Sequence, residues 1–183
     1  FVDQGHRLFI APPDDRPDAT LLDAIHDGVA RGYAQGYLRM SMVDDPIDRR
    51  INTRTNTPAV IHHRFVPGET LTLAAMAKGA GCENKSKAAM LIPAQGRQGV
   101  LDFVVGAAAT AGADACPPFV LGVGVGGNLE TAAILRQRAL LRTLDPRHPD
   151  TFYATLEADM LDAITTTGVG SPALRGRTNA LRV

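Results

Sequence analysis

The stretch A-C-P-P-F-V-L-G-V-G-V-G-G-N, residues 115–128, says more about the fold than any other segment of the chain. Its apolar run, residues 119–125, has the β-branched and aromatic content of a buried strand. Glycines in and after this run would let the backbone turn tightly and approach a ligand closely: Gly124, Gly126 and Gly127. We therefore expect a strand that leads into a glycine-rich turn.

A helix is predicted directly after this turn. From Leu129 the chain continues L-E-T-A-A-I-L-R-Q-R-A-L-L-R, which is strongly helical in composition, and Asn128 is suited to be the N-cap. A strand, a glycine loop and a helix N-terminus in succession favour the binding of an anion. Cys116 lies just upstream and makes this more than a generic anion site.

The composition is that of an ordinary globular protein, with 183 residues, 45% of them hydrophobic and 21% charged. A formal net charge of zero argues against a field that would collect nucleic acid or an anionic membrane. No apolar run reaches the roughly 20 residues that a membrane-spanning helix needs. Two cysteines give no disulfide framework, so we expect a cytoplasmic protein. Residues 1–183 are expected to form a single domain, truncated at both ends.

Helical periodicity predicts a first helix that Asp18 caps and that ends near Gly32 or Gly36. Further helices are predicted over residues 88–92, 99–111, 129–142 and 150–164, the last of them capped by Asp150. Residues 44–57, which are charged and rich in turn formers, are expected to form an irregular loop. Two β-leaning runs, residues 58–66 and 70–76, flank a Pro-Gly turn and are expected to pair antiparallel. Long helices with few strands and no regular βαβ alternation predict an α+β fold, in which helices pack with a small antiparallel sheet.

Three local features each leave two interpretations open. Arg39, embedded among apolar residues, either pairs with a structural carboxylate or binds the carboxylate of a substrate. His62 and His63 suggest a metal site, but neighbours on a strand point to opposite faces, which favours a core or interface role. The loop K-G-A-G-C-E-N-K-S-K, residues 78–87, is either a solvated turn or a loop folded around an anion.

Several blocks, taken in order, resemble one family: the catalytic α subunit or N-terminal domain of class I iron–sulfur fumarase and L-tartrate dehydratase. The matching blocks are G-Y-L-R-M-S (36–41), N-T-P-A-V-I-H (56–62), V-P-G-E-T-L (66–71), K-G-A-G-C-E-N-K-S (78–86), C-P-P-F-V-L-G-V-G-V-G-G (116–127) and the tail 168–183. The ordered set is specific, although no single block is.

The resemblance implies a hydro-lyase that adds or removes water on a dicarboxylate such as fumarate/malate or tartrate/oxaloacetate. It also implies a 4Fe–4S cluster held by three cysteines, whose open iron acts as a Lewis acid. By the same resemblance, Cys116 is a cluster ligand, Arg39 a substrate-carboxylate arginine, and Gly79 and Gly81 substrate-contacting backbone. Asp3 matches the aspartate of the family's Cys-Gln-Asp-Thr-Gly motif and is the candidate catalytic and substrate-binding carboxylate.

The chain departs from the family pattern at several positions. Phe1 stands where the family has its first cluster cysteine, and the third cysteine would lie beyond Val183. Cys82 replaces the usual serine of the Gly-Ser-Glu-Asn block, either as a substitute metal ligand or as a free buried thiol. Arg175 replaces a glycine of the tail.

These features support two main hypotheses. The first is a hydro-lyase α subunit or domain for a small dicarboxylate, completed by a β-type subunit or C-terminal domain in a homodimer or α2β2 assembly. The second is a cluster-free homologue that binds a carboxylate or serves as an assembly partner. A nucleotide-binding module is disfavoured, because no Lys-Ser/Thr pair follows the glycine run.

Overall fold

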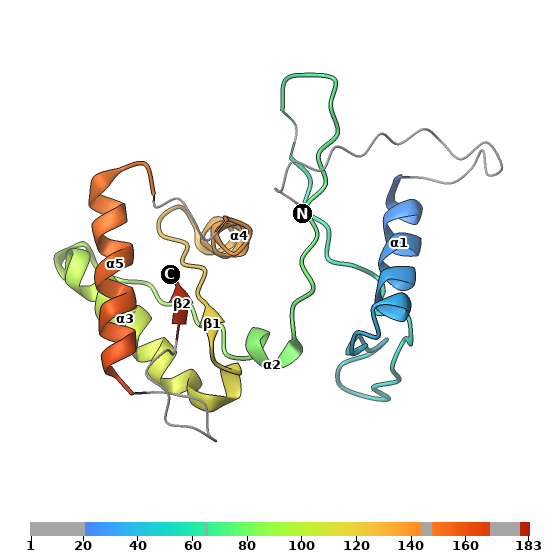
Figure 1. The fold of residues 1–183 in the computed structure, drawn as a ribbon, viewed down its shortest axis with the longest axis horizontal. Coiled ribbons are helices and arrows are strands. Elements are labelled where there is room, and N and C mark those ends of the chain that lie inside the picture. Colours follow the sequence, from blue (N-terminus) through green and yellow to red (C-terminus); the bar gives the residue numbers. More distant parts are fainter. Residues whose placement is uncertain (1–20, 65, 144–147, 169–179) are drawn as a thin grey trace. The chain divides into compact units, whose positions relative to one another are not determined.

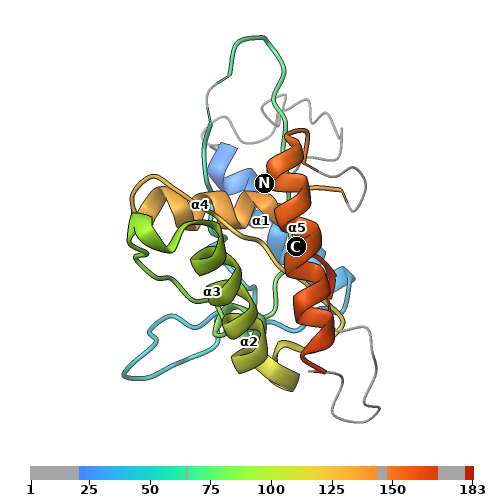
Figure 2. The same ribbon diagram turned by 90° about the vertical axis from the view of Figure 1, so that its left-hand side faces the viewer.

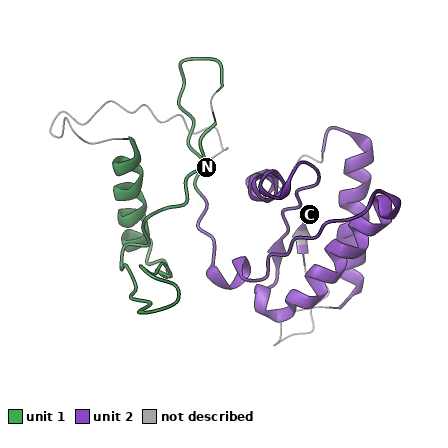
Figure 3. Cartoon of the chain, turned by 180° about the vertical axis from the view of Figure 1, so that it is seen from behind, with its two compact units in different colours: residues 1–75 green, residues 76–183 purple. Residues whose placement is uncertain are grey.

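The computed structural model describes residues 21–64, 66–143, 148–168 and 180–183. The chain divides into two compact units, residues 1–75 and residues 76–183 (Figure 3). The single domain expected over residues 1–183 stays a prediction, because this division concerns compactness and not independent folding. Among the described residues, no helix combines the length and the apolarity needed to cross a membrane.

The first unit contains α1 (Leu21–Gln35; Figure 1). Its end is marked by two backbone hydrogen bonds, from Gly36 N to Gly32 O at 2.9 Å and from Leu38 N to Tyr33 O at 3.0 Å. The predicted helix and its predicted end near Gly36 are confirmed. Its predicted cap, Asp18, lies outside the described residues.

Loops make up the rest of the described part of this unit. One antiparallel bridge joins Val43 to Asn52, and the predicted irregular course of residues 44–57 is confirmed. Residues 58–66 and 70–76 were expected to form an antiparallel pair, but no strand element lies in these runs where the structure describes them. Thr72, in the second run, nevertheless forms a single β-bridge, so the antiparallel pairing of the two runs stays a prediction.

The core of the second unit lies between two helices, α3 (Gly96–Ala111) and α5 (Thr151–Thr166), which lie side by side (Figure 2). α5 buries Leu156, Met160 and Ile164, spaced four residues apart on one face. Burying a side chain of this size contributes about 1.5–3 kcal/mol. Both helices were predicted, and the predicted cap of α5 is confirmed, because the Asp150 carboxylate accepts from Phe152 N at 2.8 Å.

Two short strands complete this core, β1 (Phe119–Val120) and β2 (Ala180–Arg182). They pair in parallel, with Phe119 opposite Ala180, and β2 also contacts α5. The strand predicted over residues 119–125 is thus limited to its first two residues. The α+β class with an antiparallel sheet stays a prediction, since the only sheet in the described ranges is this parallel pair.

The remaining elements are α2 (Ala80–Glu83), α4 (Leu129–Ala139) and two 3-10 turns, η1 (Pro93–Gln95) and η2 (Gly112–Ala115). The helix predicted over residues 88–92 is wrong, because these residues have no helical assignment. Pro93 disfavours a helical conformation at the residue before it, and Ile92 is extended, with φ −79° and ψ 149°.

Candidate functional site

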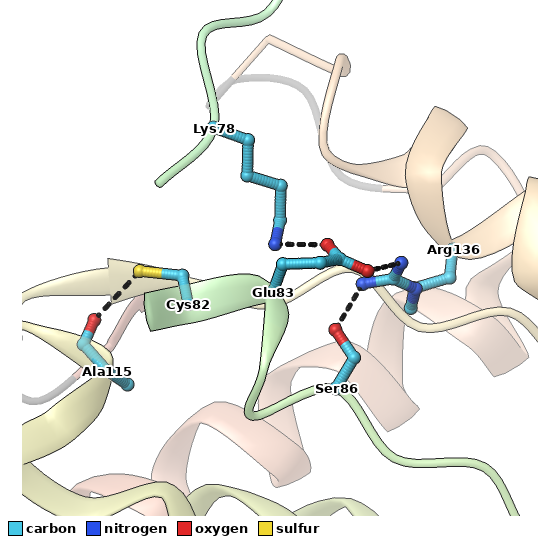
Figure 4. A network of polar contacts seen from close by, with 6 residues as sticks. All are labelled: Lys78, Cys82, Glu83, Ser86, Ala115 and Arg136. Carbon is cyan, nitrogen blue, oxygen red and sulfur yellow. Dashed lines mark hydrogen bonds and ion pairs between the residues drawn. The ribbon is translucent and has the colours of Figure 1, made fainter. Parts of the chain in front are cut away.

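The contact between α2 and η2 brings the two cysteines of the chain near each other. The Cys82 thiol, on α2, donates a hydrogen bond to the carbonyl oxygen of Ala115 at 3.3 Å (Figure 4). Cys116 is the next residue, exposed and in a left-handed conformation with φ 56°. Its sulfur lies 3.9 Å from the carbonyl oxygen of Asp114, a long contact. We call residues 79–82 and 114–116 the thiol site.

Both candidate substrate-contacting glycines belong to the thiol site. Gly79 is the extended residue before α2, and its carbonyl accepts from Glu83 N at 3.1 Å. A Cβ on Gly81 would lie 3.8 Å from the carbonyl oxygen of Asp114, an ordinary contact distance. The structure thus brings Gly79, Gly81, Cys82 and Cys116 together from two segments about 30 residues apart in the sequence.

Glu83 anchors this turn to α4 (Figure 4). It pairs with Lys78, and its other oxygen accepts from Arg136 at 2.9 Å. Arg136 also donates to the Ser86 hydroxyl at 2.7 Å. Partial burial would raise the pKa of Glu83, but the hydrogen bonds from Lys78 and Arg136 outweigh this effect and hold the pKa below its usual value of 4.5. Two cations around one carboxylate leave a net positive charge beside the thiol site.

A second ion pair fixes the other side of the contact. The Lys85 ammonium donates to the Asp114 carboxylate at 2.7 Å and so joins the residues after α2 to η2. This hydrogen bond lowers the pKa of Asp114 below its usual value of 3.8. Both groups are partly or largely exposed, so the pair contributes little to stability. The pair instead helps to fix the position of the residues after α2 relative to η2.

The glycine-rich stretch serves helix packing as well as a turn. A Cβ on Gly124 would lie 2.1 Å from the carbonyl oxygen of Ala132, and one on Gly122 would lie 2.3 Å from that of Arg136. Both glycines therefore let residues 121–125 lie directly on α4. The expectation that Gly124 allows close approach to a ligand is not supported, because its open side faces the backbone of α4.

The turn after this segment is as predicted. Gly126 and Gly127 adopt φ values of 91° and 73°, which suit glycine. Asn128 caps α4, as predicted, because its side-chain oxygen accepts from Thr131 N at 2.8 Å.

Arg39 lies in the first unit, whereas the thiol site lies in the second. It is exposed, and no carboxylate among the described residues forms an ion pair with it. The interpretation that pairs Arg39 with a structural carboxylate therefore gains no support from the described residues. Asp3 lies outside them.

The thiol site does not by itself fit a cluster that needs three cysteine ligands. The chain contains two cysteines. Within the described ranges, no group of three or more His, Cys, Asp or Glu side chains is placed to hold a metal ion. Any complete cluster would therefore need a ligand from outside these residues.

Sequence reasoning missed the contacts that hold the thiol site together. The pairing of Glu83 with Arg136 joins residues 53 positions apart, and no local pattern indicates it. The charged residues of the 78–87 loop were a signal, because a Lys and a Glu flank the glycines. Their partner on α4 could be found only from the fold.

Comparison with known proteins gives a consistent result. The family model of fumarate hydratase ("Fumerase") matches residues 5–183. A protein of Methanocaldococcus jannaschii with the provisional name L(+)-tartrate dehydratase subunit alpha is 42% identical over 113 residues, which are 62% of this chain and 40% of the relative. The L(+)-tartrate dehydratase subunits alpha of Escherichia coli K12 and Shigella sonnei are both 35% identical over 105 residues, 57% of this chain and 35% of theirs. The chain thus matches well under half the length of these relatives.

Proposed function

This chain belongs to the fumarate hydratase family, and on that basis we propose that it is the α-type part of a hydro-lyase for a small dicarboxylate. The observation that carries the proposal is the family match over residues 5–183. The names of the relatives point to L-tartrate, and that of the family to fumarate. The reaction removes a hydroxyl group and a proton from adjacent carbons as water, or adds them back.

Arg39 is the proposed carboxylate-binding residue. A guanidinium presents a planar fork of N–H donors that matches a carboxylate, and such charge-assisted bonds are among the stronger polar contacts. The exposure of Arg39 supports this role. Gly79 and Gly81 are proposed to contact the substrate through their backbone, and Asp3 to act as the catalytic carboxylate.

The two thiols are proposed as this chain's contribution to an iron–sulfur centre, with Cys116 as one ligand and Cys82 as a second. The convergence of Cys82 on the residue before Cys116 supports this pairing. A further ligand has to come from elsewhere, so no chemical step is assigned to a cluster. The name "subunit alpha" of the relatives supports a β-type partner subunit or domain. A homodimer or an α2β2 assembly in the cytoplasm belongs to the same proposal.

Binding of L-tartrate and fumarate to the full chain tests the role of Arg39. We expect Arg39→Ala to weaken binding at least about tenfold, because a charge-assisted contact is lost. Arg49→Ala is the matched control, since Arg49 is also an exposed arginine of the first unit. Equal affinities of Arg39→Ala and the unchanged chain would exclude Arg39 as the carboxylate-binding residue.

A cluster-free homologue that binds a carboxylate is the second candidate. The specific observation in its favour is that, among the described residues, no group of three or more His, Cys, Asp or Glu side chains is placed to hold a metal ion. Anaerobic reconstitution of the protein, together with a β-type partner, separates the two candidates. Bound iron and sulfide support the enzyme, whereas colourless protein that still binds the dicarboxylate supports the homologue.

A further inference from the structure

The backbone on both sides of Arg39 is fixed by hydrogen bonds. On the N-terminal side, Leu38 N donates to the Tyr33 carbonyl oxygen at 3.0 Å, which ties the segment to the end of α1. On the C-terminal side, the carbonyl oxygen of Met40 accepts from the Asn52 side chain at 3.0 Å. Hydrogen bonds on both sides of Arg39 therefore fix its backbone in space.

A second asparagine holds the next two residues. The side-chain oxygen of Asn56 accepts from Ser41 N at 2.8 Å and from Met42 N at 3.0 Å. One amide group thus binds two successive backbone N–H groups, 15 and 14 residues away in the sequence. We call Asn52 and Asn56 the asparagine clamp.

The conformation of the clamp suits its residue type. Asn56 has a φ of 55°, in the left-handed region, which asparagine tolerates better than most residues. The Asn52 side chain also accepts from Arg54 N at 2.7 Å and so supports a second left-handed residue, with φ 59°. Hydrogen bonds that join residues 40–42 to Asn52 and Asn56 therefore stabilise a loop with two residues in the energetically unfavourable left-handed conformation.

The Arg39 side chain contrasts with its fixed backbone. It is exposed, and no carboxylate among the described residues pairs with it. Because the backbone at Arg39 is already fixed, less conformational entropy is lost when the guanidinium binds a ligand. We propose that Asn52 and Asn56 are positioning residues that hold Arg39 ready for the carboxylate of the substrate. This inference rests on the proposed function, because it takes Arg39 as the carboxylate-binding residue.

The test is a titration of the 15N-labelled full chain with L-tartrate, followed by NMR, in which the same spectra report structure and affinity. Asn56→Gly keeps the left-handed conformation accessible but removes the acceptor for Ser41 and Met42. Asn56→Asp restores an acceptor at the same place and is the conservative rescue. Arg39→Ala is measured alongside, because it tests the proposed function on its own.

We expect Asn56→Gly to speed hydrogen exchange of the Ser41 and Met42 amides and to weaken L-tartrate binding about tenfold, while the α1 signals stay unchanged. Asn56→Asp should bind L-tartrate at least about threefold more tightly than Asn56→Gly, which is half of the tenfold loss on a logarithmic scale. Faster exchange of both amides without loss of affinity would overturn the inference, because the clamp would then only shape the loop. If Arg39→Ala leaves binding unchanged, the proposed role of Arg39 fails and this inference fails with it.

A second variant covers the case in which Asn56→Gly unfolds the first unit. Asn52→Asp keeps the oxygen that accepts from Arg54 N but lacks the N–H that donates to Met40. Weaker L-tartrate binding with intact α1 signals supports the clamp. Unchanged binding by a folded Asn52→Asp chain contradicts the part assigned to Asn52.

Discussion

At the scale of single residues, one asparagine and two glycines show how residue type and position determine this structure. Asn56 combines a left-handed φ of 55° with an acceptor for two backbone N–H groups. Gly122 and Gly124 lack a Cβ where α4 leaves no space for one. The sequence pattern marked Gly124, though not Gly122, but connected it with a turn and a ligand and not with packing on α4. A glycine in the sequence looks the same whether it lets the backbone approach a helix or a ligand.

The packing role of Gly124 predicts the effect of adding one methyl group. Gly124→Ala would place a Cβ 2.1 Å from one backbone atom of α4 and 2.7 Å from another, so the segment or the helix has to move. We expect a loss of about 3 kcal/mol in the free energy of unfolding, measured by urea denaturation.

Gly106→Ala, in the exposed face of α3, is the control for this prediction. No atom lies within 4 Å of the added Cβ, and a helix interior favours alanine over glycine by about 0.5–1 kcal/mol. The control should therefore be slightly more stable than the unchanged chain. If Gly124→Ala shows the same gain, residues 121–125 do not pack on α4 as described.

The ion pairs of Glu83 predict a dependence of stability on pH. The pKa of Glu83 is lowered in the folded chain, so its pairs with Lys78 and Arg136 stabilise the fold fully above pH 4.5. This contribution is lost as the pH falls below 4.5 and through the lowered pKa. The Glu83 side chain is 45% exposed, so solvent screening limits the effect to about 1 kcal/mol or less.

Glu83→Gln tests this dependence. At pH 7 the variant should unfold at a lower urea concentration than the unchanged chain, because the charge that pairs with two cations is gone. The difference should shrink when both chains are measured near pH 3. A difference that stays constant between pH 7 and pH 3 would mean that the charge of Glu83 does not contribute.

At the scale of elements, sequence predicted best where a local signal was strong. α1 and α5 were predicted from apolar periodicity and caps, α4 from its composition and cap, and α3 from its composition. The caps Asn128 and Asp150 are confirmed. Residues 88–92 were wrongly predicted as a helix, because Pro93 was not weighed against helical composition. The parallel pairing of β1 and β2 joins residues about 60 positions apart, and no local pattern indicates such a contact.

The contact between α2 and η2 predicts that one short reagent can bridge both thiols. The Cys82 sulfur lies 3.3 Å from the Ala115 carbonyl oxygen, and peptide geometry places that oxygen within about 3 Å of the Cys116 Cα. A bifunctional thiol reagent should therefore yield mainly a single intrachain adduct, which peptide mapping by mass spectrometry identifies.

Cys82→Ser, which removes the Cys82 thiol, is the control for this experiment and should give only an adduct at Cys116. If the unchanged chain instead carries two separate adducts, one on each cysteine, the thiols are farther apart than the contact between α2 and η2 implies.

At the scale of the whole chain, each of the two compact units contains some of the residues that are proposed to act in function. The first unit presents Arg39 on a clamped loop, and the second presents Gly79, Gly81 and both cysteines at the thiol site. Resemblance to the family singled out Arg39, Gly79, Gly81 and Cys116, and Cys82 stood out as a departure from the family pattern. Neither Asn52, Asn56 nor Arg136 was identified as a supporting residue, because hydrogen bonds between distant segments follow from the fold and not from local sequence.

The measurement that tests the central claim most directly is a dehydration assay. The chain is purified anaerobically with a β-type partner, reconstituted with iron and sulfide, and incubated with L-tartrate, L-malate or fumarate. The account predicts that water is removed from, or added to, at least one of these dicarboxylates, and that Arg39→Ala lowers this rate. A complex that carries iron and sulfide but converts none of the three would contradict the assignment as the α-type part of a hydro-lyase.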